Sequence, residues 1–249
     1  MFDAMLEDIR AVKRNDPAAH SWLEVLLCHV PLHAVLLYRV AHWLHTGLGL
    51  RLAARLLSVV TRFWTGVEIH PGARIGRGFF IDHGAGVVIG ETATIGEYCV
   101  MFHNVTLGGT GKYRGSRHPS VGDHVFIGTN AILLGPIRVG DRARIGANAF
   151  VINHDVPPDS TVVGTPARIV KLDGERTDLE LPRMARLPGA EAVDLQQAAV
   201  TGPSASLAPS AARGASIISA WTCSIRRTPT RRRRPHRWPT ACGRGVSTR

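Results

Sequence analysis

Two histidines beside charged residues lie where a regular repeat in the sequence is interrupted. Asp82-His83 falls in an eight-residue step between apolar positions, and Arg117-His118 falls in a fourteen-residue step. Histidine titrates near neutral pH, so it is the usual base for activating a hydroxyl nucleophile. A carboxylate on the other ring nitrogen would orient the imidazole and stabilise its cation. These residue types therefore indicate general-base chemistry, with His83 as the candidate base.

The repeat that positions these residues is an aliphatic side chain every six residues, often followed by glycine. A fixed period of this length is typical of a parallel β-helix, in which three strand-and-turn units make one coil of about eighteen residues. Glu68 precedes His83 by fourteen residues, which places them on neighbouring levels or across adjacent subunits. The side chains predicted to point inward are Ile69, Ile75, Ile81, Ile89, Ile95, Met101, Leu107, Val121, Ile127, Leu133, Val139, Ile145 and Val151.

The residues before the repeat have helical spacing. We expect helices over 1–14, from the Ser21-x-x-Glu24 capping box to about 30, over 32–47 and over 50–64. The predicted fold class is α+β. Its parts are a helical bundle (1–65), a β-helix (66–172) and a low-complexity basic tail (173–249) that cannot bury enough apolar surface to fold.

Charge is unevenly distributed along the 249 residues. The net charge is +11, of which residues 1–175 carry +2 and the remaining 74 residues carry +9. The repeat region thus has no basic stripe, and we expect no specific nucleic-acid binding. The four cysteines lack CxxC spacing, no signal peptide is visible, and no apolar run reaches the roughly 18 residues of a membrane span. We therefore expect a cytoplasmic protein that does not enter membranes.

Several motifs together identify a family. They are Asp16-Pro17, Val67-Glu68-Ile69-His70-Pro71, Ile81-Asp82-His83-Gly84, Gly90-Glu91-Thr92, Leu107-Gly108-Gly109-Thr110-Gly111, Arg117-His118-Pro119 and Val163-Gly164-Thr165-Pro166. Over residues 1 to about 172 the chain resembles the serine acetyltransferases. The resemblance implies a left-handed β-helix that transfers acetyl from acetyl-CoA to the serine hydroxyl, giving O-acetylserine in the first step of cysteine biosynthesis.

The resemblance also implies roles for individual residues. His83 would be the base, and Glu68, where many relatives have Asp, would be its partner. The ammonium group of serine would lie by Asp16 and Asp82, and its carboxylate by Arg117 and His118, with Glu91 in the wall of the site. Acetyl-CoA would contact Gly109, Thr110, Thr129, Arg144 and Ala147, and no metal is expected.

Two other enzymatic functions fit the repeat. One is acyl transfer to a sugar or another small acceptor. The other is a hydratase of the γ-carbonic-anhydrase type, with zinc ligands drawn from His83, His103, His118 and His124.

The resemblance also bears on assembly. The short helical domain favours a homotrimer, with a hexamer possible. Related enzymes bind cysteine synthase through a terminal isoleucine, whereas this chain ends in Val246-Ser247-Thr248-Arg249. A complex of that kind is therefore not expected.

Overall fold

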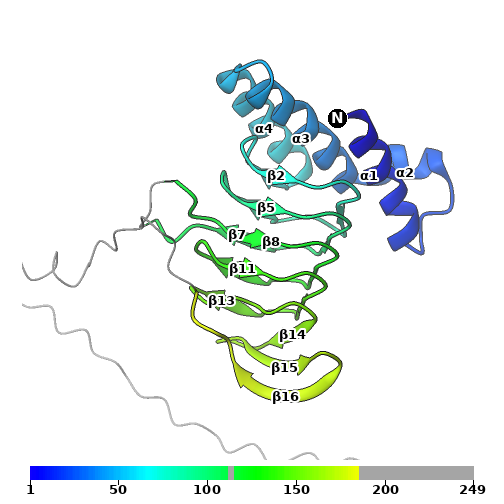
Figure 1. Cartoon of the computed structure of the whole chain (residues 1–249). Helices are drawn as coiled ribbons and strands as arrows, with labels where there is room; N and C mark the ends of the chain where they lie inside the picture. The colour runs from blue at the N-terminus through cyan, green and yellow to red at the C-terminus, as the bar shows by residue number, and fades with distance from the viewer. Residues whose placement is uncertain (112–114, 185–249) are drawn as a thin grey trace, which may run out of the picture. The chain divides into compact units, whose positions relative to one another are not determined.

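A computed structural model describes residues 1–111 and 115–184, which form four helices followed by a parallel β-helix (Figure 1). The helices are α1 (Phe2–Asn15), α2 (Trp22–Cys28), α3 (Val30–Thr46) and α4 (Arg51–Thr65). All four predicted helices are confirmed, as is the capping box, in which Ser21 accepts from the Glu24 backbone N–H at 3.0 Å. No single described helix has the length and apolarity to cross a membrane, although α2 and α3, bent by 74°, meet that measure as a pair.

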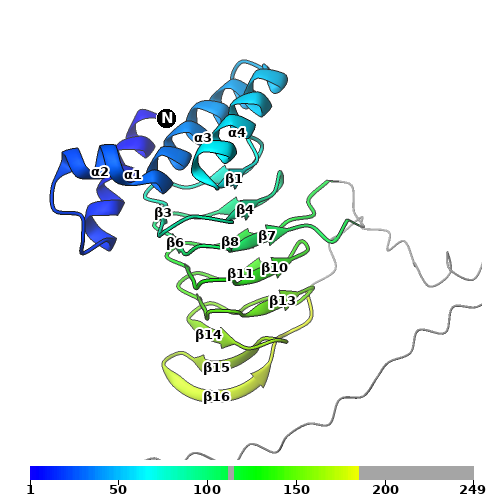
Figure 2. The same cartoon turned by 180° about the vertical axis from the view of Figure 1, so that it is seen from behind.

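The β-helix is built from short strands that stack in three sheets (Figure 2). The first sheet has the order β1-β4-β7-β10-β13, the second β2-β5-β8-β11 and the third β3-β6-β9-β12-β14-β15-β16. The strands are β1 (Glu68–Ile69), β2 (Arg74–Ile75), β3 (Phe80–Ile81), β4 (Val88–Ile89), β5 (Thr94–Ile95), β6 (Val100–Met101), β7 (Thr106–Gly108), β8 (Ser120–Val121), β9 (Phe126–Ile127), β10 (Ile132–Leu134), β11 (Arg138–Val139), β12 (Arg144–Ile145), β13 (Phe150–Ile152), β14 (Ser160–Val163), β15 (Arg168–Leu172) and β16 (Glu175–Glu180).

The core of the β-helix is the predicted ladder of aliphatic side chains. Every one of the thirteen predicted inward positions is buried, from Ile75 at 8% exposed to Leu133 at 0%. Each inward side chain stacks on its neighbours in the coils above and below, so one continuous apolar column holds the strands together. The fold prediction, a left-handed parallel β-helix after a helical bundle, is confirmed.

The two interruptions of the repeat change the register of the coils. Val88 pairs with Thr106, eighteen positions later, which is the regular coil length. Glu68 pairs with Val88, twenty positions later, because the turn after β3 is longer. Thr94 pairs with Ser120, twenty-six positions later, because the connection between β7 and β8 is eight residues longer than in a regular coil. The inward ladder continues past both insertions, so the additional residues lie outside the core.

The three corners of the β-helix are named here by the residues they carry. The His83 corner joins the third sheet to the first, the His118 corner joins the first to the second, and the acidic corner joins the second to the third. In this order, and as far as they are described, they comprise residues 82–87, 102–105, 128–131 and 146–149; residues 70–73, 90–93, 109–119 and 135–137; and residues 76–79, 96–99, 122–125 and 140–143.

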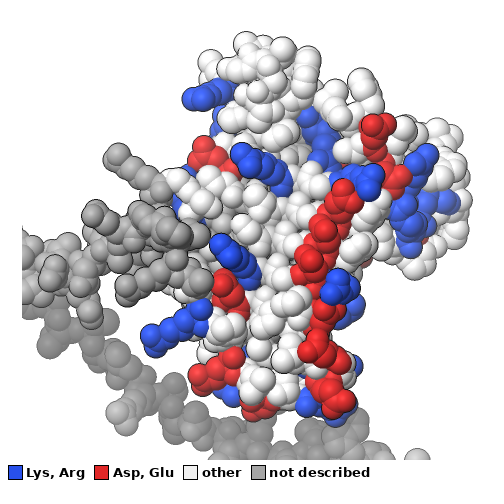
Figure 3. Space-filling view, in the orientation of Figure 1, with Lys and Arg blue, Asp and Glu red and all other residues white. Residues whose placement is uncertain are grey.

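An acidic line runs down one edge of the molecule in Figure 3. At the acidic corner, Asp123 Oδ1 accepts from the Glu97 backbone N–H at 2.7 Å, and Asp141 Oδ1 accepts from the Asp123 N–H at 2.9 Å. Arg142 pairs with Asp159 at 2.6 Å. These carboxylates thus accept hydrogen bonds from backbone N–H groups of the preceding coil or bind arginine, which gives the line a structural role.

The predicted boundary of the tail at residue 173 is wrong for residues 175–180. Asp173 and Gly174 both have positive φ, as a two-residue hairpin turn requires, and they return the chain as β16, antiparallel to β15. Beyond the strand, Leu181 is buried against the last coil. The sequence prediction missed β16 because almost all its side chains are exposed and its backbone pairing holds it. The remainder of the predicted disordered tail, 185–249, lies outside the described residues.

A buried ion pair joins the helices to the first coils. Arg39 Nε on α3 contacts Asp8 Oδ2 on α1 at 3.0 Å, and its guanidinium also donates to the carbonyls of Ile75 and Gly76. Asp8 accepts from the Phe79 backbone N–H at 3.0 Å. Desolvation raises the pKa of Asp8 because the loss of hydration outweighs the attraction of Arg39. The pair is therefore held by a complete set of hydrogen bonds.

Removing one partner of this pair is expected to destabilise the fold strongly. Asp8→Ala leaves the Arg39 charge buried without its carboxylate, which costs about 3–5 kcal/mol in the free energy of unfolding. Chemical denaturation measures this loss. The control is Glu7→Ala on the same helix, whose carboxylate pairs with Arg10, 58% exposed, and which should cause little change. Equal denaturation midpoints for Asp8→Ala and Glu7→Ala would contradict a stabilising role for the buried Asp8–Arg39 pair.

Candidate active site

The His83 corner presents an exposed imidazole. The His83 side chain is 75% exposed, and its Nε2 lies 3.7 Å from Asp82 Oδ1. The ring of His103, one coil further along, meets it edge-on with centroids 6.0 Å apart. Thr129 Oγ1 lies 2.8 Å from His103 Nε2 and holds that second ring. His83 is thus open to solvent on a surface made rigid by its neighbours.

Glycines make the widened turn at this corner possible. His83, Gly84 and Gly86 all have positive φ. A Cβ on Gly84 would lie 3.0 Å from Pro31 of α3, and a Cβ on Gly86 would lie 1.9 Å from Asn104 Oδ1. Only glycine fits at positions 84 and 86. These two glycines therefore allow the widened turn that holds the His83 imidazole outside the apolar column.

Two carboxylates from different parts of the chain lie near this corner. Asp16, at the end of α1, and Asp82 both act electrostatically on His29, raising its pKa against the larger lowering effect of burial. The His29 ring packs on Phe80 with centroids 5.7 Å apart. The structure therefore brings Asp16 and Asp82, sixty-six residues apart, to one neighbourhood, where two negative charges suit a cationic group.

Glu68 has a different partner from the one expected. Its Oε2 lies 2.8 Å from Nη1 of Arg62, in the last turn of α4. Glu68 stands on β1 with its side chain half-exposed on the outer face of the first sheet, beside the end of that helix. Its action on His83 stays a prediction.

The His118 corner gathers hydrogen-bond donors. Arg117 Nη2 donates to Glu91 Oε2 at 2.7 Å, and this contact lowers the pKa of Glu91. His118 is 8% exposed, and its ring fills the space beside Gly90, where a Cβ would lie 2.1 Å from Nε2. Thr92 contacts the backbone of both Arg117 and His118. The predicted residues Glu91, Arg117 and His118 are thus adjacent.

His70 belongs to the same corner. Its Nδ1 accepts from the Gly72 backbone N–H at 2.9 Å, and its ring lies edge-on to His45 of α3 with centroids 6.2 Å apart. Burial and the nearby charge of Arg55 lower the pKa of His70 to about 4, against the opposing effect of Glu91. His70 is therefore neutral at physiological pH, with its ring proton on Nε2.

The two corners lie at opposite ends of the first sheet. The His83 corner leads into β4 and the His118 corner begins where β4 ends, so within one chain a strand separates the two sets of side chains. One set is acidic with an exposed imidazole, and the other is rich in donors. Each is half of what a zwitterionic substrate needs.

The predicted acetyl-CoA positions divide in the same way. Gly109 and Thr110 lie at the His118 corner, whereas Thr129 and Ala147 lie at the His83 corner in successive coils. Thr110 Oγ1 is buried without a hydrogen-bond partner among the described residues. The guanidinium of Arg144 lies 4.6 Å over the Phe126 ring on the third sheet.

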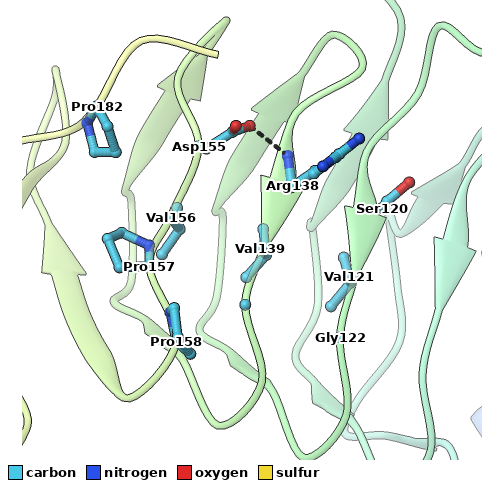
Figure 4. A pocket seen from close by; sticks show the side chains of 11 residues that line it. Ser120, Val121, Gly122, Arg138, Val139, Asp155, Val156, Pro157, Pro158 and Pro182 are labelled. Carbon is cyan, nitrogen blue, oxygen red and sulfur yellow. Dashed lines mark hydrogen bonds between the residues drawn. The ribbon is translucent and has the colours of Figure 1, made fainter. Parts of the chain in front are cut away.

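An open hollow elsewhere on the β-helix is lined by none of the predicted catalytic, substrate-binding or acetyl-CoA-binding residues. It lies on the second sheet and is lined mainly by apolar side chains, among them Val139, Pro157 and Pro182 (Figure 4). Asp155 accepts from the Arg138 backbone N–H there at 2.7 Å. The charged and titratable groups of the two corners lie apart from it.

Comparison with known proteins decides the family. The chain is 52% identical over 178 residues to the serine acetyltransferase of Synechococcus elongatus, with 72% of each chain covered. It is 53% identical over 182 residues to that of Bacillus subtilis, covering 73% of this chain and 83% of the relative. The chain belongs to the serine acetyltransferase family. The resemblance read from the motifs is therefore confirmed.

Solved serine acetyltransferases have similar folds. The Neisseria gonorrhoeae enzyme aligns with a TM-score of 0.66 and 40% identity, covering 76% of this chain and 67% of that one. Soybean serine acetyltransferase complexed with serine aligns with a TM-score of 0.64 and 46% identity over 68% of each chain. Residues 118–153 also match the family model described as bacterial transferase hexapeptide (six repeats).

Three residues near these corners had no functional role in the sequence analysis. His29 lies in the helical region outside the family motifs, and His70 lies in the motif Val67-Glu68-Ile69-His70-Pro71 but outside the interruptions of the repeat. Thr92 had a usable signal, since it completes the family motif Gly90-Glu91-Thr92. Among the described residues, no group of three or more His, Cys, Asp or Glu side chains is arranged to hold a metal ion.

Proposed function

We propose that this chain is a serine O-acetyltransferase, which moves acetyl from acetyl-CoA to the L-serine hydroxyl and supplies O-acetylserine for cysteine biosynthesis. The observation that carries the proposal is the His83 corner, where an exposed imidazole stands beside Asp82 and near Asp16. Membership of the serine acetyltransferase family supports the same reaction.

The proposed chemistry assigns one proton-transfer group. His83 takes the proton of the serine hydroxyl as that oxygen attacks the thioester carbon of acetyl-CoA. The C–S bond then breaks, and the imidazolium returns the proton to the departing thiolate, so free CoA and O-acetylserine leave. Asp16 and Asp82 would hold the ammonium group of serine, while Arg117 and His118 would bind its carboxylate. Glu91 fixes Arg117, and Glu68 would orient His83 once released from Arg62.

We propose further that the site forms between subunits of a homotrimer. The acidic half at the His83 corner and the donor half at the His118 corner are separated by a strand within one chain. A neighbouring copy that sets its His118 corner against the first chain's His83 corner would complete both the serine site and the acetyl-CoA groove. Closed cyclic symmetry then makes each interface alike.

The outer face of α4 supports self-association. Its buried side consists of small or polar residues such as Ala54 and Ser58, whereas large apolar side chains face solvent. These exposed residues repeat at helical spacing and are Leu52 (75% exposed), Leu56 (59%), Val59 (57%), Val60 (63%) and Phe63 (94%). Such a stripe is typical of a protein interface. Light scattering should give three times the 26.9 kDa chain mass, and six times would indicate a hexamer.

Two further parts of the proposal are a cytoplasmic location and acetyl-CoA as the acyl donor. Cys28 and Cys99 are free thiols among the described residues, which suits a reducing cytoplasm. Thr110, whose Oγ1 has no hydrogen-bond partner within the part of the chain that the structure describes, and Arg144 are the proposed contacts of acetyl-CoA, the latter with one of its phosphates.

The proposal is tested by turnover of the purified full-length chain. Thiol release from acetyl-CoA is followed with serine, with a panel of sugars and without acceptor, and mass spectrometry identifies the product. We expect serine-dependent thiol release and O-acetylserine. Thiol release with a sugar but none with serine would establish the other acyltransferase function. Carbon dioxide hydration that zinc restores after chelation would establish the hydratase.

A further inference from the structure

Thr92 makes an unusually complete set of contacts with Arg117 and His118, in the segment that leads into β8. Its Oγ1 accepts from the backbone N–H of Arg117 at 3.0 Å and from that of His118 at 3.2 Å. The same oxygen lies 2.8 Å from His118 Nδ1, and the Thr92 backbone N–H donates to that nitrogen at 3.2 Å. One half-buried threonine therefore contacts both predicted carboxylate-binding residues.

These contacts decide which nitrogen of His118 carries the proton. A backbone N–H can only donate, so His118 Nδ1 must be an acceptor and carries no hydrogen. The Thr92 hydroxyl oxygen already accepts from two N–H groups, so its own hydrogen is directed to Nδ1 as well. The neutral ring must then hold its proton on Nε2.

The surroundings keep His118 neutral. Burial lowers the pKa of His118, and the adjacent Arg117 lowers it further, against the opposing effect of Glu91. Protonation at Nδ1 would also abolish the hydrogen bond from the Thr92 backbone N–H, which can only donate, and would require the Thr92 hydroxyl to accept instead. The His118 ring packs against Gly90, where any residue with a Cβ would clash with the ring. This packing also fixes the plane of the ring.

We propose that Thr92 is a positioning residue that holds His118 as a neutral Nε2–H donor to the carboxylate of the acceptor substrate, and thereby excludes His118 as a second general base. This rests on the proposed serine acetyltransferase activity. A donor to the carboxylate acts equally in the ground state and the transition state, so its loss raises KM for serine and leaves kcat nearly unchanged. Loss of a base would lower kcat.

The kinetic test compares two substitutions at one position. Thr92→Val has the same shape but no hydroxyl, and should raise KM for serine about tenfold while kcat and KM for acetyl-CoA change less than about twofold. Thr92→Ser retains the hydroxyl and should stay within about twofold of the wild type. The control is Thr94→Val, two residues along on β5, whose hydroxyl makes no hydrogen bond among the described residues and whose kinetics should match the wild type.

A spectroscopic readout tests the tautomer directly. In full-length protein labelled with ¹⁵N-histidine, the signals absent from His118→Gln identify this ring. We expect an unprotonated Nδ1 and a protonated Nε2 at pH 7. A protonated Nδ1, an equal KM in Thr92→Val and the wild type, or a fall in kcat alone would overturn the proposal. Absence of serine turnover in the wild type would instead overturn the proposed function, since the tautomer is read without substrate.

Discussion

His83→Asn is expected to lower kcat for serine acetylation by about 10²–10⁴-fold, the usual contribution of a positioned general base. Asparagine cannot take the hydroxyl proton at neutral pH. It does tolerate the left-handed backbone that His83 adopts, with φ of 61°, so the widened turn should keep its shape. Steady-state kinetics with serine and acetyl-CoA measure the loss. The thermal midpoint and KM for acetyl-CoA should stay close to the wild-type values.

The matched control is His124→Asn. His124 also has a positive φ, at 55°, but it lies at the acidic corner with its ring stacked on Tyr98. Because both variants exchange the same residue types in the same backbone conformation, they differ only in the corner affected. We expect His124→Asn to retain wild-type kcat. Full activity in His83→Asn, or an equal loss in both variants, would contradict the assignment of His83 as the base.

The fold was predictable because its main signal is local. Each inward position, such as Ile95 or Ile127, recurs at a fixed spacing, and burial of that side chain requires no knowledge of distant residues. The insertions at residues 82–87 and 109–119 were readable for the same reason, since they displace an otherwise regular period.

Features that depend on tertiary contacts were not predictable. Asp8 and Arg39 have the sequence context of surface charges on amphipathic helices, and only packing on the first coils reveals the buried pair. Glu68 has a neighbour in Arg62 that no motif indicates. Only the structure shows that the predicted site residues fall at two different corners of the β-helix. The order of the motifs along the chain does not say which corner each motif occupies.

That division leads to an experiment on assembly. If each site takes His83 from one chain and His118 from its neighbour, then two inactive variants can restore activity together. His83→Asn lacks the base, and His118→Ala lacks the donor to the serine carboxylate. At serine concentrations near the wild-type KM, both homo-oligomers should be nearly inactive.

Co-expression of the two variants with different tags gives mixed oligomers. In a cyclic trimer assembled at random from equal amounts, about one site in four combines an intact His83 with an intact neighbouring His118, so about a quarter of wild-type activity should return. Doubly purified mixed trimers should exceed either parent many-fold, with wild-type KM for serine at the restored sites. If one chain supplied both histidines to the same site, each site would carry one defect and no activity would return. The recovered fraction therefore measures directly whether the two corners of different chains meet.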